Sequence, residues 1–158
     1  AGVVVTDNAD LYEKLFYNLN TTGAVLSPFD SYQLIRGLKT LSLRMERSTA
    51  NAQEIVAFLE QSPAVKEVLY TGRGGMISFK VADEKRIPHI LNTLKVFSFA
   101  ESLGGVESLI TYPTTQTHAD IPAEVRHSYG LTDDLLRLSI GIEDARDLIE
   151  DLRQALEG

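Results

Sequence analysis

The sequence contains no cysteine among its 158 residues. This absence excludes disulfides, thiolate metal sites and a cysteine nucleophile, and it fits a cytoplasmic protein. No apolar run approaches the roughly 20 residues that a membrane-spanning helix needs. Cations are also sparse, because 15 Lys and Arg stand against 22 Asp and Glu, with a formal net charge of −7 and no basic block. Since nucleic acids and anionic membranes bind clustered cations, we expect neither as a partner.

The chain opens directly on an apolar run, residues 1–5 (AGVVV), which is typical of a buried strand. A natural chain rarely begins inside a core strand, so we expect this sequence to be a segment of a longer protein. Hydrophobic residues make up 44% and charged residues 23% of the chain. These values and the length are ordinary for one globular domain.

Hydrophobic spacing and turn residues predict long helices first and short strands later. This order predicts an α+β fold, a small antiparallel sheet covered on one face by helices, with the other face free for a ligand or partner. The expected strands are 2–6, 65–70, 76–81, 95–99, 107–111 and 135–140. The expected helices are 8–19, 27–37, a longer one to about residue 60, 87–94, 122–130 and 142–157, the last with Ile142 inward.

Several tempting motifs have ordinary structural interpretations. His89, His118 and His127 share no metal-ligand spacing, and the chain offers no cysteine to join them. The run 72–75 (GRGG) lacks both the dinucleotide fingerprint and the Gly-Lys-Ser/Thr ending of a phosphate loop. It is typical of a tight turn between two strands, because glycine supplies the positive φ that such turns need.

Arg137 is the first candidate binding residue. In a strand over 135–140, Leu136 and Leu138 share one face, and Arg137 and Ser139 share the other. An arginine on the non-core face is commonly just solvated. The functional alternative is a bidentate clamp for a substrate carboxylate, which the planar guanidinium serves best.

The second candidate is the connection 100–108 (AESLGGVES), which joins two apolar strands. It is either a simple glycine-bearing connection or a binding loop. In the second case its glycines let the backbone approach a ligand, and Glu101 and Ser102 supply polar contacts.

Further segments match one known enzyme group in order and spacing. They are 23–31 (GAVLSPFDS), 36–41 (RGLKTL), 44–45 (RM), 97–110 (FSFAESLGGVESLI), 112–120 (YPTTQTHAD) and 135–144 (LLRLSIGIED). Together they resemble the interdomain helix, substrate loop and terminal strand of the cystathionine γ-synthase and γ-lyase group. These are enzymes of methionine and cysteine metabolism that depend on pyridoxal phosphate (PLP). The short connection 69–76 resembles the compact form of Bacillus-type γ-synthase/O-acetylhomoserine lyases.

The resemblance implies a fold and a role for each matching residue. Residues 1–26 would be a remnant of the large cofactor domain. Residues 27–158 would be the C-terminal substrate domain found in PLP-dependent transferases of the aspartate aminotransferase type. Arg137 would hold the α-carboxylate of an amino-acid substrate, Ser102 would lie beside it, and Glu101 would help to select the substrate.

The chain departs from the group's pattern in one respect. The group's PLP lysine lies in a Ser/Thr-rich stretch before the strand that residues 1–5 resemble, and the other cofactor contacts lie further upstream. This implies that the full-length enzyme uses PLP, whereas this segment holds no catalytic, cofactor-binding or metal-binding residue. We expect it to be inactive alone and to form homo-oligomers through exposed apolar faces. Two alternatives remain: a non-catalytic interaction or small-ligand module, and complementation by a separate cofactor-binding chain.

Overall fold

The computed structural model describes residues 1–158. The chain divides into two compact units, Ala1–Ser42 and Leu43–Gly158. The predicted division at residue 26 concerns the family's cofactor and substrate domains, and it stays a prediction. No helix is both long and apolar enough to cross a membrane.

The first unit contains two helices, α1 (Ala9–Thr22) and α2 (Pro28–Leu38). Both begin where the sequence predicts. The Asn8 side chain accepts a hydrogen bond from a first-turn backbone N–H of α1. Ser27 caps α2 in the same way, ahead of a proline at the first helical position. Neither helix has a buried residue, so the apolar stripes of this unit are left uncovered.

The predicted strand at 2–6 is wrong, because residues 1–8 belong to no strand. Val3, Val4 and Val5 are 74%, 72% and 89% exposed. A strand needs neighbouring backbone to pair its N–H and C=O groups, and no other strand of this chain pairs with this segment.

The second unit contains a five-stranded sheet in the order β1-β2-β5-β4-β3. The strands are β1 (Val65–Leu69), β2 (Met76–Val81), β3 (Ser98–Phe99), β4 (Leu109–Thr111) and β5 (Leu135–Ser139). The helices are α3 (Leu41–Leu59), η1 (Glu84–Arg86), α4 (Ile87–Thr93), α5 (Ala123–Ser128) and α6 (Ala145–Glu157). The α+β class is therefore confirmed.

The expectation of a fully antiparallel sheet is wrong at one edge. β3 and β4 run parallel, with Ser98 opposite Leu109, whereas the other three pairings are antiparallel. The connection 100–108 does not fold back as a hairpin. It carries the chain to the beginning of β4, so that both strands run in the same direction and the sheet is mixed.

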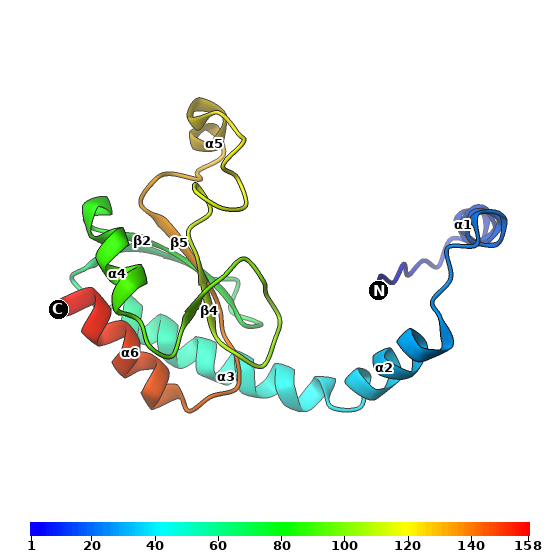
Figure 1. The fold of residues 1–158 in the computed structure, drawn as a ribbon, viewed down its shortest axis with the longest axis horizontal. Coiled ribbons are helices and arrows are strands. Elements are labelled where there is room, and N and C mark those ends of the chain that lie inside the picture. Colours follow the sequence, from blue (N-terminus) through cyan, green and yellow to red (C-terminus); the bar gives the residue numbers. More distant parts are fainter. The chain divides into compact units, whose positions relative to one another are not determined.

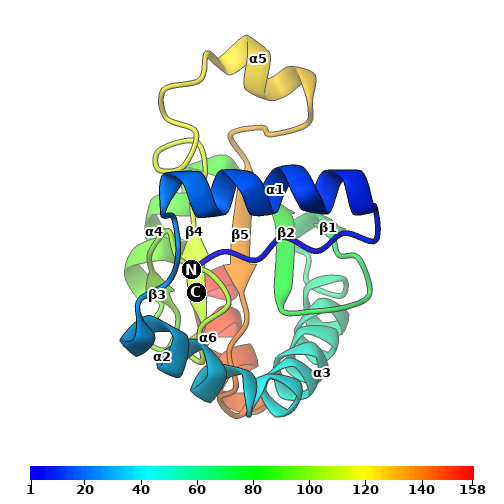
Figure 2. The same cartoon turned by 90° about the vertical axis from the view of Figure 1, so that its right-hand side faces the viewer.

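One face of the sheet forms the core. Alternate residues of β2, β4 and β5 are buried there against α3, α4 and α6, which gather on one side of the strands (Figures 1 and 2). The fully buried members are Ala52, Ile55, Leu59, Ile77, Phe79, Ile110, Leu136, Leu138, Leu148, Leu152 and Ala155. Since this face is closed by helices of the same unit, a ligand has to use the opposite, polar face.

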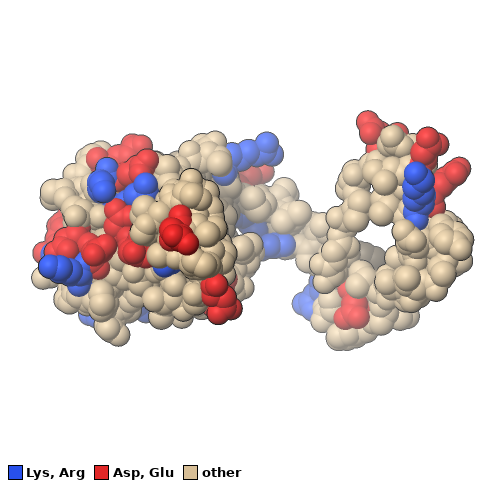
Figure 3. Space-filling model, turned by 90° about the horizontal axis from the view of Figure 1, so that it is seen from above, with Lys and Arg blue, Asp and Glu red and all other residues tan.

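Ile142 does not point inward as predicted, because it is 38% exposed. It precedes the Asp144 cap of α6 and lies outside the apolar stripe of that helix. On the face shown in Figure 3, basic and acidic side chains of this unit are interspersed.

Candidate functional site

The polar face of the sheet carries Arg137 near its centre. Arg137 lies on β5 between Ser78 of β2 and Thr111 of β4, which are its register partners. Its neighbours along the strand, Leu136 and Leu138, are fully buried on the core face. The side chain is therefore directed away from the core, as the alternation along the strand predicts.

The guanidinium of Arg137 is held through one of its three nitrogens, and other donors of the group stay without a partner. Nη2 donates to Thr111 Oγ1 and to the backbone oxygen of Glu101, both at 3.1 Å. Nε is buried and has no hydrogen-bond partner. A buried donor without an acceptor carries a free-energy penalty. An anionic ligand that accepts from Nε would remove this penalty, and a carboxylate matches the planar geometry of the group.

The connection 100–108 is hydrogen-bonded to the last residues of β4 and β5. Thr111 Oγ1 donates to the backbone oxygen of Ala100 at 2.7 Å, and the Gly104 N–H donates to Ser139 Oγ at 3.0 Å. The structure thus brings the predicted loop and Arg137 together. The loop is attached through backbone groups, and these attachments hold it beside the guanidinium.

The two predicted side chains of this loop make no contact with Arg137. Glu101 meets the guanidinium only through its backbone oxygen, and the side chains of Glu101 and Ser102 are exposed at the surface. Their substrate-binding roles stay predictions. The structure establishes that residues 101–104 lie beside Arg137 on the polar face of the sheet.

The sequence did not predict Thr111 as a contact of Arg137, and it placed Ser139 on the face of Arg137 without predicting its contact with the loop. Both are nearly fully buried on the polar face, at 1% and 3% exposure. Ser139 shares the face of Arg137 by simple alternation. Thr111 becomes its neighbour only through the register between β4 and β5, which no local pattern in the sequence reveals.

A small pocket of about 180 Å³ lies next to this loop. It is formed by the start of α3, the hairpin residues 73–76, the loop residues 103–105 and the end of β5. The hairpin approaches β5 closely, because a Cβ at Gly75 would lie 2.7 Å from the backbone oxygen of Ile140. Gly75 is therefore required by this contact, whereas Gly72 and Gly74 supply the positive φ of the turn.

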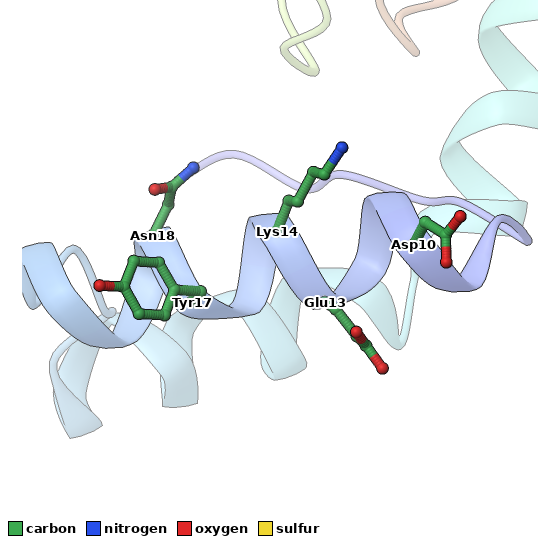
Figure 4. Close-up of a pocket in the computed structure, with 5 residues that line it drawn as sticks. All are labelled: Asp10, Glu13, Lys14, Tyr17 and Asn18. Atoms are coloured by element: carbon green, nitrogen blue, oxygen red, sulfur yellow. The ribbon is translucent and has the colours of Figure 1, made fainter.

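A hollow along α1 offers no binding geometry. Figure 4 shows the five side chains that line it, all on one helix and pointing in diverging directions: Asp10, Glu13, Lys14, Tyr17 and Asn18. Because no second element faces them, they cannot surround a ligand. No group of three or more His, Asp or Glu side chains is arranged to hold a metal ion.

The lysines of the sheet are engaged in ion pairs. Lys80 Nζ lies 2.6 Å from the Glu67 carboxylate, and that hydrogen bond raises the pKa of Lys80. Lys66 Nζ lies 3.3 Å from Asp134. Burial raises the pKa of Asp134, but hydrogen bonds from Thr132 and Lys66 outweigh burial and lower it.

These ion pairs matter for the cofactor that the resemblance implies. An imine-forming lysine must react as the neutral amine, whereas Lys80 is kept protonated. Lys85 and Lys95 are exposed, and neither contacts Arg137. None of the lysines of the second unit thus contacts Arg137, and the absence of a PLP site in this chain stays a prediction.

Comparison with known proteins gives one consistent result. The profile of the family described as Cys/Met metabolism PLP-dependent enzyme matches residues 1–157. The chain is 56% identical over 156 residues to the cystathionine gamma-synthase/O-acetylhomoserine (thiol)-lyase of Bacillus subtilis (strain 168), covering 99% of the chain and 42% of that protein. It is 49% identical over 172 residues to the cystathionine gamma-lyase of the same organism, covering 99% and 45%.

Solved structures give the same picture. The chain superposes on a cystathionine gamma synthase from Xanthomonas oryzae pv. oryzae in complex with aminoacrylate and cysteine, with a TM-score of 0.89 and 40% identity over 97% of the chain and 44% of that protein. A cystathionine gamma-lyase from Lactobacillus plantarum complexed with L-serine gives a TM-score of 0.87 and 37% identity, covering 97% and 44%. The chain thus spans less than half the length of these relatives.

Proposed function

Because this chain belongs to the Cys/Met metabolism family of PLP-dependent enzymes, we propose that it is the C-terminal, substrate-binding portion of a transsulfuration enzyme. The full-length enzyme would act on an O-acyl-homoserine, cysteine or cystathionine. Arg137 would bind the α-carboxylate of that substrate. The observation that carries the proposal is the buried Nε of Arg137, which has no acceptor within the chain.

The geometry around Arg137 supports this role. Thr111 and the Glu101 backbone both accept from Nη2, so the plane of the guanidinium is fixed before a ligand arrives. Such preorganisation lowers the entropic cost of binding. The two solved relatives contain L-serine, or aminoacrylate and cysteine, and each of these ligands carries a carboxylate.

The loop contributes the side chains that would distinguish one substrate from another. The side chains of Glu101 and Ser102 are exposed, and the Glu101 backbone oxygen accepts from Arg137. A substrate held at Arg137 would extend past them, so a carboxylate and a hydroxyl at these positions would select among side chains of different polarity. Ser102 would also contact the substrate carboxylate.

The alignments favour a γ-synthase type of parent enzyme. Both Bacillus subtilis relatives match 99% of this chain. The alignment with the γ-synthase/thiol-lyase is 156 positions long, whereas the alignment with the γ-lyase is 172 positions long. The longer alignment contains residues that this chain lacks. The compact connection at 69–76 agrees with this difference.

The cofactor would be supplied from outside these 158 residues. PLP acts as an electron sink that acidifies the Cα–H bond of a bound amino acid. This chain would bind, orient and select the substrate, and we expect no activity from it alone. The family is involved in methionine and cysteine metabolism.

A titration with PLP tests whether the cofactor site lies outside this chain. The isolated chain should give no stoichiometric visible absorbance band that borohydride removes, because no lysine is available beside Arg137. The full-length enzyme, treated identically, serves as the positive control. A stoichiometric, borohydride-sensitive band in the isolated chain would contradict the proposal.

A further inference from the structure

The carboxylate of Glu143 binds Ser108, at the C-terminal end of the loop 100–108 that contacts Arg137. Its Oε1 accepts from the Ser108 N–H at 2.6 Å, and its Oε2 accepts from Ser108 Oγ at 2.9 Å. Ser108 Oγ in turn accepts from the Gly141 N–H at 2.9 Å. Ser108 is fully buried, so its N–H and its hydroxyl depend on this arrangement, whereas its backbone oxygen accepts from the Ser98 N–H.

The segment that carries Glu143 is itself attached to α3. The Asn51 amide donates to the backbone oxygens of Glu143 at 2.9 Å and Gly141 at 3.2 Å. Arg47 Nη2 donates to the same Glu143 oxygen at 3.1 Å. Asn51 is fully buried. The longest helix of the unit thus fixes the position from which the carboxylate reaches the loop.

A close backbone approach completes the attachment. The Ile142 N–H donates to the Val106 backbone oxygen at 2.9 Å. A Cβ at Gly141 would lie 2.1 Å from that same oxygen, so only glycine allows this contact. The chain after β5 and the end of the loop are therefore packed against each other at backbone distance.

The loop is consequently attached at four places. Thr111 binds the Ala100 oxygen, Ser139 binds the Gly104 N–H, the Ile142 N–H binds the Val106 oxygen, and Glu143 binds Ser108. The Glu101 oxygen that accepts from Arg137 lies between the first two attachments. Loss of the Glu143 carboxylate would leave the buried Ser108 N–H without its acceptor and would weaken the hold on residues 105–108. We expect the segment that orients the guanidinium to become more mobile as a result.

We propose that Glu143, acting through Ser108, is a positioning residue that holds the 101–105 loop and thereby the guanidinium of Arg137 in the orientation that binds a substrate carboxylate. This inference rests on the proposed function. Glu143 touches neither Arg137 nor the expected ligand position. Its contribution is the charge-assisted, two-oxygen grip, which is stronger than a neutral hydrogen bond.

Steady-state kinetics of the full-length enzyme test this role. Glu143→Ala should raise the KM for the amino-acid substrate by about 5- to 20-fold and change kcat by less than about threefold, because a weaker grip chiefly reduces binding. Glu143→Gln keeps one carbonyl acceptor for Ser108 and should recover most of the loss. The matched control is Glu150→Ala, which removes a carboxylate that is 74% exposed on α6.

A double-mutant cycle separates positioning from general weakening. In an Arg137→Lys background, Glu143→Ala should have less than half its effect on log KM, because the oriented fork is already gone. Full additivity would overturn the inference. If Arg137→Lys itself leaves KM unchanged, the proposed function fails. If Arg137→Lys raises KM and Glu143→Ala does not, only the positioning role fails.

Hydrogen exchange in the 158-residue chain gives a readout that needs no activity. Glu143→Ala should accelerate amide exchange in a peptide covering 100–108 by at least about fivefold, since the Ser108 N–H loses its acceptor and the segment loses an attachment. A peptide covering 145–157 should keep its rate. Equal acceleration in both peptides would indicate global destabilisation and would contradict a local positioning role.

Discussion

Replacement of Arg137 by lysine tests the central contact of the proposed site. The arginine uses Nη2 for Thr111 Oγ1 and the Glu101 oxygen, and it keeps a separate donor, Nε, without a partner. A lysine carries all its donors on a single nitrogen. Its ammonium group can therefore donate to Thr111 and Glu101 or to a carboxylate, but it cannot bind a carboxylate through two nitrogens in one plane.

The expected cost follows from the bonds that are lost. At least one charge-assisted hydrogen bond to the substrate disappears, which is worth about 1.5–3 kcal/mol. This corresponds to an increase of roughly 10- to 150-fold in KM for the amino-acid substrate. Because the positive charge is retained, the effect reports geometry rather than the loss of electrostatic attraction.

The assay is steady-state turnover of the full-length enzyme with an O-acyl-homoserine and a thiol. Arg146→Lys is the matched control, since Arg146 is 87% exposed and pairs with Asp144 at 3.1 Å, outside the site. Circular dichroism and bound PLP confirm that each variant is folded and loaded. A KM within twofold of the wild type for Arg137→Lys would refute the carboxylate-clamp reasoning.

Three further predictions concern the 158-residue chain itself. Asp151→Ala removes the acceptor for the three backbone N–H groups of residues 95–97. Urea denaturation should show a decrease of about 3 kcal/mol or more in the free energy of unfolding, and a decrease below about 1 kcal/mol would contradict this prediction. Hydrogen bonding to Arg146 lowers the pKa of Asp144 to about 2. The ionised Asp144 therefore stabilises the fold above pH about 4, the pKa of aspartate in the unfolded chain, and this stabilisation is lost as the pH falls towards about 2. In an NMR titration Arg146→Ala should move that midpoint up, and an unchanged midpoint would refute the pairing. Light scattering should give a mass above 17.4 kDa, because the apolar side chains of residues 1–42 are exposed; a monodisperse monomer would instead favour the non-catalytic module.

Local signals in the sequence determined most element boundaries. Asn8 and Ser27 begin α1 and α2 because their side chains satisfy first-turn N–H groups of the same helix. The alternation in 135–140 placed Arg137 opposite the core, because successive side chains of a strand point to opposite faces. Each of these signals depends on residues only a few positions apart, and so each is readable without coordinates.

The tertiary structure alone decided how distant segments meet. The parallel pairing of β3 with β4 brings Ser98 opposite Leu109. The register of β4 with β5 puts Thr111 beside a guanidinium 26 positions away. The grip of Glu143 on Ser108 spans 35 positions. No periodicity encodes such contacts, because they depend on the path of the whole chain. Residues 2–6 show the converse, since a sequence typical of a buried strand stays unpaired when this chain provides no neighbouring strand for it.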